Sequence, residues 1–174
     1  MKKHPENRAK TIIDFLKMVP HPEGGHYCRS YCSDVVIKKE SLPSAFNGAR
    51  ALSSAIYFLL EGDQFSALHR IKSDEIWHFY EGAALNLSII SPSGQLINKK
   101  LGTDIEAGEE FQIVVPAGSW FGAEVTDQDS YTLFGCTVAP GFDFNDFELG
   151  SRNELIKIFP NHARIIRELT KEAK

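Results

Sequence analysis

Long apolar runs, cysteines and an excess of basic charge are all scarce in this sequence. No apolar run approaches the roughly 20 residues that a membrane-spanning helix needs, so we expect no membrane partner. Lysine and arginine total 19 against 23 aspartate and glutamate, a net charge of −4. Because nucleic-acid binding requires a concentrated positive field, we expect no nucleic-acid partner. The basic N-terminus has no apolar segment typical of a secretory signal.

The three cysteines, Cys28, Cys32 and Cys136, do not indicate a disulfide framework. Their number is odd, and Cys28 and Cys32 would be about 13 Å apart along one strand, too far for a disulfide bond. We therefore expect reduced thiols and a cytoplasmic location. Hydrophobic residues make up 43% of the 174 residues and charged residues 24%, which is typical of a globular protein and favours a single domain over residues 1–174.

Helical patterns occur only near the two ends of the chain. Residues 7–18 carry an apolar stripe that ends before Pro20, and residues 151–171 open with Ser151–Glu154 in the form of a capping box. The core between them, residues 23–140, favours an all-β sandwich or barrel whose closed sheet protects its edges. Alternating side chains and turn signals predict strands at 26–32, 34–37, 52–60, 65–70, 75–80, 85–90, 95–100, 111–115, 120–125 and 131–138.

The densest group of titratable and aromatic side chains lies in residues 69–82, with two histidines, three carboxylates and three aromatics. If strands 65–70 and 75–80 pair, His69 and Glu75 can lie opposite each other inside a barrel. An imidazole beside a carboxylate can transfer protons or contribute to a metal site. The sequence contains no phosphate-binding, dinucleotide-binding or metalloprotease motif and no GxSxG nucleophile motif.

Two motifs resemble those of the cupin superfamily. The first is the series Gly62, His69, Glu75 and Gly82, and the second is the proline turn at residues 116–118. The resemblance implies a jelly-roll-like β-barrel, here with helices at both ends. Residues 22–27, 73–78, 114–121 and 136–142 look like the small cupin family usually labelled a domain of unknown function. That closer resemblance implies a homodimer and a scaffold similar to dTDP-sugar 3,5-epimerases.

The departures from the cupin pattern concern its metal ligands. The second histidine of the first motif falls at Ile71, the histidine of the second motif at Phe121, and the later asparagine at Val125. His69 and Glu75 remain as ligands if any metal binds, with His78 or His26 to complete the set. Because catalytic zinc sites mostly supply three protein ligands, we expect no cofactor.

We predict a protein that binds a small polar metabolite and that acts as an isomerase or epimerase by proton transfer. His69 is the predicted base, Glu75 its orienting partner and Tyr57 the acid, although Tyr57 also suits a core position. The alternatives are a metal-dependent cupin enzyme with an incomplete ligand set and a ligand-binding or sensor cupin without chemistry.

Further side chains are candidates for contact with the ligand, each with an ordinary structural alternative. Strict alternation points His78 away from Glu75. Tryptophans more often pack in a core than stack on ligands, and Arg29 suits a surface ion pair. The segment 142–148 alternates aromatic and acidic residues without the spacing of a calcium loop, so we expect a loop that packs its aromatics. The predicted ligand-binding residues are His78, Trp77, Trp120, Glu23, Arg29 and Phe121.

Overall fold

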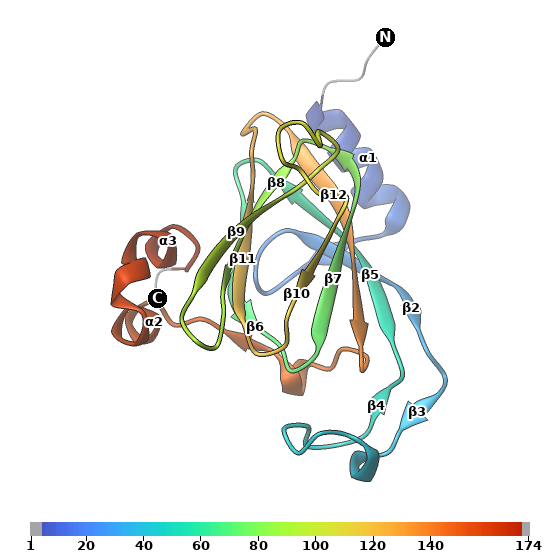
Figure 1. Cartoon of the computed structure of the whole chain (residues 1–174). Helices are drawn as coiled ribbons and strands as arrows, with labels where there is room; N and C mark the ends of the chain where they lie inside the picture. The colour runs from blue at the N-terminus through green and yellow to red at the C-terminus, as the bar shows by residue number, and fades with distance from the viewer. Residues whose placement is uncertain (1–4, 172–174) are drawn as a thin grey trace.

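The computed structural model describes residues 5–171, with side chains from residue 8 onward. The fold is mostly β, and its main strands form two facing antiparallel sheets (Figure 1). The large sheet has the order β1 (Val19–Pro20), β2 (His26–Cys32), β5 (Ser54–Glu61), β12 (Tyr131–Ala139), β7 (Asp74–Gly82) and β10 (Gln112–Val115). The small sheet has the order β13 (Glu148–Leu149), β6 (Phe65–Arg70), β11 (Trp120–Val125), β8 (Leu85–Ile90) and β9 (Leu96–Leu101).

The predicted all-β fold with helices at both ends is confirmed. The sequence also led us to expect one closed β wall, whereas the strands pair as two separate facing sheets. The predicted strands 65–70 and 75–80 do not pair with each other: β6 and β7 belong to opposite sheets. The predicted strand 52–60 begins two residues late, because residues 52 and 53 lie between β4 (Arg50–Ala51) and β5. β3 (Val36–Ile37) pairs with β4 in a small hairpin below the sheets in Figure 1, with a turn of 3₁₀-helix, η1 (Lys39–Ser41), between them.

Helices cover the outer faces of the two sheets. α1 (Pro5–Leu16) buries Ala9 and Ile12 against Leu59 and Tyr131 of the large sheet. α2 (Arg152–Ile158), η3 (Pro160–His162) and α3 (Ala163–Glu168) lie on the small sheet at the opposite side of the molecule (Figure 1). Ser151 precedes α2 as predicted, but its side chain makes no capping hydrogen bond. No helix among residues 5–171 is long and apolar enough to cross a membrane.

The main core lies between the sheets and follows from the period of two along each strand. In β5 the side chains of Ile56, Phe58 and Leu60 point inward, while Tyr57 and Leu59 pack under α1. Apolar residues on both faces of this strand are explained by the helix that covers its outer face. The apolar side chains of this core do not fill one end of the space between the sheets, and the candidate site lies at that end.

Candidate functional site

A small cavity opens between the two sheets, with an estimated volume of about 50 Å³. This is room for a few water molecules or a compact ligand. β2, β5, β7 and β12 supply one wall, β6 supplies the other, and the segments before β2 and after β12 cover the mouth. The lining residues are His21, Glu23, Tyr27, Arg29, Ser54, Ala55, Ile56, Phe58, His69, Ile71, Glu75, Cys136, Val138, Phe142, Phe144 and Phe147.

Glu23 reaches this cavity through a tight turn before β2. Gly24 has a φ of +126° and Gly25 a φ of +66°, which are accessible to glycine at little cost. A Cβ at Gly24 would overlap the carbonyl oxygen of Phe65, so this turn can lie against β6 only with glycine there. The backbone carbonyl of Glu23 then accepts a hydrogen bond from the N–H of Ala67 at 2.9 Å. The buried carboxylate is thereby placed beside the inner face of β6.

The carboxylate of Glu23 contacts His69 directly, with 3.1 Å between Oε2 and Nε2. The other ring nitrogen, Nδ1, lies 2.8 Å from the carbonyl oxygen of Ala67 and must donate there, because a carbonyl only accepts. In a neutral imidazole, Nε2 then carries a lone pair and faces a carboxylate oxygen. The contact becomes favourable once a proton lies between the two atoms, so the pair is a proton-accepting group.

Two further side chains contact the carboxylate of Glu23. The hydroxyl of Ser66 donates to Oε1 at 2.7 Å, and Nδ1 of His21 lies 3.4 Å from Oε2. Burial opposes the ionisation of Glu23, but His69, His21 and Ser66 together outweigh burial and hold its pKa below the ordinary value. His21 lies between Pro20 and Pro22, and these prolines predict only that the preceding helix ends there. The Gly24–Gly25 pair was the available signal that the segment turns back toward the sheet.

Glu75 lies on β7, in the wall opposite β6, and its surroundings raise its pKa instead of lowering it. Its side chain is buried near Cys136 and Val138 of β12. Burial raises the pKa of Glu75 to about 8 against the weaker effect of a Cys136 hydrogen bond, and the charge of Glu23 raises it further. Glu75 is therefore a neutral carboxylic acid at pH 7. The cavity has an uncharged acid on one wall and an ionised carboxylate on the other.

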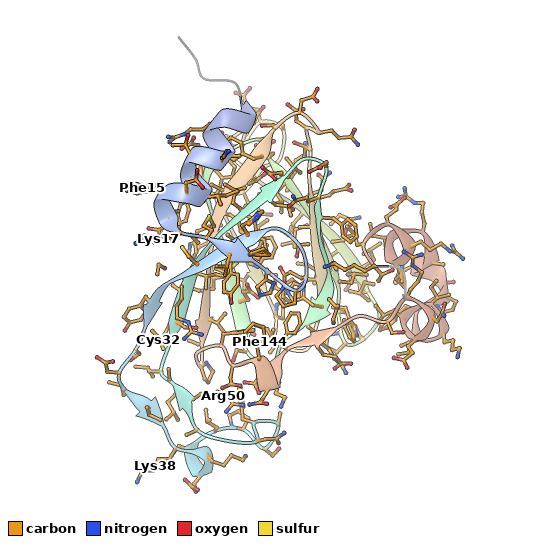
Figure 2. The ribbon with its side chains drawn as sticks, turned by 180° about the vertical axis from the view of Figure 1, so that it is seen from behind. Phe15, Lys17, Cys32, Lys38, Arg50 and Phe144 are labelled. Atoms are coloured by element: carbon orange, nitrogen blue, oxygen red, sulfur yellow. The ribbon has the colours of Figure 1, made fainter. Side chains whose placement is uncertain are left out.

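An aromatic strap, residues 142–147, covers the cavity mouth. It runs from β12 in the large sheet to β13 in the small sheet and includes η2 (Phe144–Asp146). The rings of Phe142, Phe144 and Phe147 line the cavity, and Phe144 stacks on His21 with 6.1 Å between ring centroids. Phe144 and Arg50 lie on the same side of the molecule in Figure 2. The expectation of a loop that packs its aromatics is confirmed.

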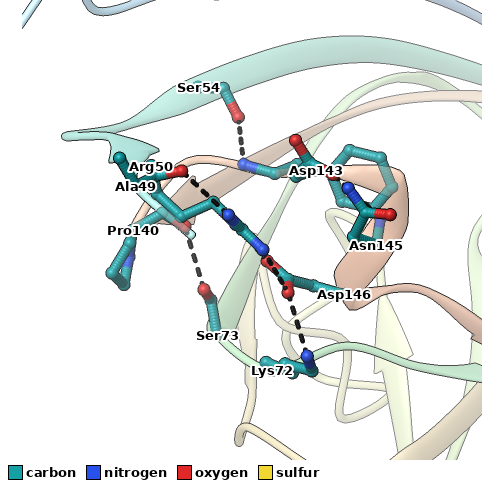
Figure 3. Close-up of polar contacts among 10 residues, drawn as sticks. Ala49, Arg50, Ser54, Lys72, Ser73, Pro140, Asp143, Asn145 and Asp146 are labelled. Atoms are coloured by element: carbon teal, nitrogen blue, oxygen red, sulfur yellow. Dashed lines mark hydrogen bonds and ion pairs between the residues drawn. The ribbon is translucent and has the colours of Figure 1, made fainter. Parts of the chain in front are cut away.

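A buried ion pair fixes the strap to the hairpin strand β4. Nε and Nη2 of Arg50 donate to the two carboxylate oxygens of Asp146 at 2.6 and 2.7 Å, and Nζ of Lys72 lies 3.3 Å from Oδ1 (Figure 3). The backbone N–H of Phe142 donates to Ser54 Oγ at 2.9 Å. These bonds fix the strap at both of its ends, so its rings are held over the cavity.

The structure brings four of the predicted residues into this cavity: His69, Glu75, Glu23 and Arg29. Phe121 lies behind them, with its ring centroid 4.1 Å from that of His69. The predicted partnership of His69 with Glu75 is wrong in one respect. No ion pair or hydrogen bond joins them within residues 8–171, and the carboxylate that contacts His69 is Glu23. The reason is that β6 and β7 are in facing sheets rather than neighbouring strands.

Four other predicted residues lie elsewhere. Tyr57 packs under α1 on the outer face of β5, so it cannot be the acid. His78 faces the other side of β7 from Glu75, where Nε2 is 3.0 Å from Thr137 Oγ1. Trp77 is stacked on Phe134 in the main core.

Trp120 packs with the C-terminal helices on the outer face of β11, under the guanidinium of Arg70 at 4.6 Å. The alternation of side chains along β7 correctly predicted that His78 points away from Glu75. Trp77 and Trp120 pack in hydrophobic cores, which was the alternative to ligand binding.

Comparison with known proteins identifies the fold and the family. A family model described as Cupin superfamily (DUF985) matches residues 10–150. The chain belongs to the cupin superfamily. A crystal structure of protein SO0799 from Shewanella oneidensis is similar, with 40% identity, a TM-score of 0.85 and coverage of 95% of this cupin and 98% of that chain. A hypothetical protein from Leishmania major is 33% identical with a TM-score of 0.84, over 94% of this chain and 99% of that one.

More distant relatives show how far the likeness extends. The uncharacterized protein YML079W of Saccharomyces cerevisiae is 26% identical over 82% of this cupin and 75% of its own length. Oxalate decarboxylase from Bacillus subtilis is 15% identical with a TM-score of 0.52, over 89% of this chain and 37% of its own. At that identity the likeness is one of fold and does not transfer activity.

Cupins commonly hold a metal ion, and the residues of this cupin do not fit one. Two of the four positions of the usual ligands carry Ile71 and Phe121, which have no side-chain donor atoms, and only His69 and Glu75 remain. Nδ1 of His69 donates to Ala67, so only Nε2, which faces the carboxylate of Glu23, carries a lone pair. Within residues 5–171 no group of three His, Cys, Asp or Glu side chains could hold a metal ion. We derive no chemical step from a metal.

Protein purified without added metal should therefore contain well under one equivalent of manganese, iron, nickel or zinc. Incubation with each ion followed by desalting should leave the content unchanged, because His69 and Glu75 alone cannot supply the three ligands of a typical site. Inductively coupled plasma mass spectrometry measures both values. One equivalent retained by the parent protein and lost in His69→Gln would contradict this expectation.

Proposed function

We propose that this cupin binds a small polar metabolite in the cavity and transfers a proton on it, as an isomerase or epimerase does. One observation carries the proposal: a proton-accepting pair and a proton-bearing acid face each other across one small cavity. When the surroundings of two titratable groups lower the pKa of one and raise the pKa of the other, the two groups are suited to act as base and acid. The predicted acid, Tyr57, is replaced in this proposal by Glu75.

The base in this proposal is His69 acting with Glu23. A proton leaving a carbon atom next to a carbonyl group is taken up by Nε2 and is then shared with Oε2 of Glu23, 3.1 Å away. The hydrogen bond from Nδ1 to Ala67 fixes the ring orientation, as the carboxylate does in a serine protease triad. Glu23 stabilises the positive charge that forms on the imidazole, which is buried and would otherwise be costly.

The acid in this proposal is Glu75. Its proton moves to the carbonyl oxygen of the ligand as the carbon loses its own proton, so that an enol forms and the net charge in the cavity is unchanged. In an isomerisation, the imidazolium then gives its proton to the neighbouring carbon, and Glu75 regains a proton from the hydroxyl group on the first carbon, which becomes the new carbonyl group. In an epimerisation, a proton from water reaches the first carbon on its other face, Glu75 regains the enol proton, and the imidazolium releases its proton to the hydroxide that is left. The apolar side chains around Glu75, among them Val138 and Ile71, keep its proton in place at pH 7.

Deuterium exchange tests this chemistry without knowledge of the natural ligand. The probes are hydroxyacetone and 2-oxobutyrate in D2O, and proton NMR follows exchange at the carbon next to the carbonyl. We expect the protein to accelerate the exchange of one or both probes. His69→Gln and Glu75→Gln should each slow it about 100-fold or more, as loss of a general acid or base does. The rate should fall at low pH, where the pair is protonated, and above about pH 8, where Glu75 is ionised.

Tyr57→Phe is the matched control, because this side chain packs under α1 outside the cavity. It should exchange the probes at the parental rate. Thermal melts of all variants establish that they are folded. Exchange that is no faster than with unfolded protein for either probe, or that survives in both cavity variants, would reject proton transfer and leave a binding protein.

A further inference from the structure

Arg29 is the cationic side chain at the mouth of the cavity. It lies on β2 opposite Ile56 of β5, and both residues line the cavity. The register of β2 shifts between Arg29 and Tyr31, so the strand is irregular directly after Arg29. Arg29 is exposed, and its guanidinium is therefore available to a ligand that enters from solvent.

The sequence left a surface ion pair as the alternative role for Arg29, and the structure shows none. Arg50 and Arg70 each contact a carboxylate within 2.7 Å. Over residues 8–171, no ion pair or hydrogen bond involves the side chain of Arg29. A planar guanidinium with five N–H donors and no protein acceptor matches a carboxylate or phosphate group.

The acidic groups inside the cavity do not compete for Arg29. The oxygens of Glu23 contact His69, His21 and Ser66. Glu75 is neutral at pH 7. The charge of Arg29 is thus not balanced by a carboxylate of the cavity wall, and a ligand anion would balance it.

A second donor lies in the same lining. Ser54 is buried on β5, and its Oγ accepts the N–H of Phe142 at 2.9 Å (Figure 3). Because the oxygen is the acceptor in this bond, the hydroxyl proton remains available to a ligand oxygen. The strap residue Phe142 therefore orients a donor in the same lining that contains Arg29.

We propose that the ligand of this site is a small carboxylic acid, whose carboxylate binds Arg29 at the mouth while its short carbon chain enters the cavity. A carboxylate needs one bidentate arginine, whereas a phosphate dianion has twice the charge, and among the described residues Arg29 is the only Lys or Arg side chain in the lining. The volume of about 50 Å³ favours a chain of a few carbon atoms. The reaction of such an acid rests on the proposed function, but its binding does not.

Binding of 2-oxobutyrate and its uncharged analogue 2-oxobutyramide tests the proposal. Calorimetry with the full-length parent protein should give an affinity for the anion that is about tenfold higher than for the amide, the range of one charged hydrogen-bonded contact. Arg29→Gln should abolish this preference and leave the affinity for the amide unchanged. Arg29→Lys should restore part of it. Arg164→Gln, at an exposed arginine on α3, is the matched control and should bind as the parent does.

Three results would overturn the proposal: equal affinity of the parent for anion and amide, an unchanged preference in Arg29→Gln, or tighter binding of inorganic phosphate than of 2-oxobutyrate. The two proposals fail separately. A charge preference that depends on Arg29 but comes without deuterium exchange supports the carboxylate ligand and rejects the chemistry. Exchange that depends on His69 and Glu75 but is indifferent to Arg29 supports the chemistry and rejects the carboxylate assignment.

Discussion

Relative to the Glu75→Gln protein, the parent protein should lose on the order of 4 kcal/mol of its free energy of unfolding as the pH rises from about 5 to 9. Burial raises the pKa of Glu75 to about 8 in the folded protein, while in the unfolded chain it lies near the ordinary value of about 4.3. Between these two values the folded protein holds a proton that the unfolded chain has released. Unfolding therefore becomes easier as the pH rises, and the loss is complete above about pH 8. Glutamine has no proton to lose and removes this dependence.

Urea unfolding of both proteins at about pH 5, 7 and 9 measures the effect as a difference in the free energy of unfolding. The comparison removes the contributions of all other titrating groups, which are common to the two proteins. Glu124→Gln, at an exposed position on β11, is the matched control and should follow the parent. Parallel curves for the parent and Glu75→Gln would show that Glu75 ionises normally, and the acid role proposed for it would then be lost.

Asp146→Ala should lower the free energy of unfolding by about 3–5 kcal/mol, the cost of leaving one member of a buried ion pair without its partner. The side chains of Arg50 and Asp146 are each only 5% exposed. Alanine removes both carboxylate oxygens that bind Arg50, and the guanidinium is left in a place that water barely reaches. The strap also loses its contact with Lys72, so His21 and the cavity mouth should become more accessible.

The pair Arg70–Glu148 is a matched control for Arg50–Asp146, because the two pairs have similar geometry but Arg70–Glu148 is exposed. Nη2 of Arg70 lies 2.7 Å from Oε2 of Glu148, but the side chains are 43% and 53% exposed. Such an exposed pair contributes about 1 kcal/mol or less to the free energy of unfolding. Glu148→Ala should therefore cost little. The double variant Arg50→Met, Asp146→Leu should recover most of the stability, since apolar replacement of a buried pair is often neutral. Equal losses in Asp146→Ala and Glu148→Ala would contradict the argument.

The sequence predicted much of the β structure because strand periodicity and turn residues are local signals. β2, β6 and β8 have the predicted bounds, and β7 extends the predicted strand by one residue before it and two after it. Alternation along β7 placed Glu75 and His78 on opposite faces, and the structure agrees. The positions of His69 and Glu75 in the cupin motif also predicted that both reach the interior.

What the sequence could not predict depends on which strands meet across the cavity. The local sequence does not show whether β6 and β7 pair as neighbours or lie in facing sheets. The predicted carboxylate partner of His69 was therefore wrong. Tyr57 was ambiguous because both faces of β5 are apolar, and only the packing of α1 shows which face is outside. His21 and Glu23 lie in a short turn without periodicity, and their contact with β6 spans more than 40 residues of the chain.

The assembly of the cavity from distant segments also bears on how the protein folds. Glu23 precedes the first long strand, Glu75 and His69 lie mid-chain in opposite sheets, and Asp146 fixes the strap near the end of the β region. Each contact closes a long loop of chain, and loop closure of this kind slows folding to the millisecond-to-second range typical of non-local β topologies. The first half of the chain contains Glu23, His69 and Glu75, but β12, which lies between β5 and β7 in the large sheet, and the strap come from the second half. The site should therefore form as one of the last events of folding.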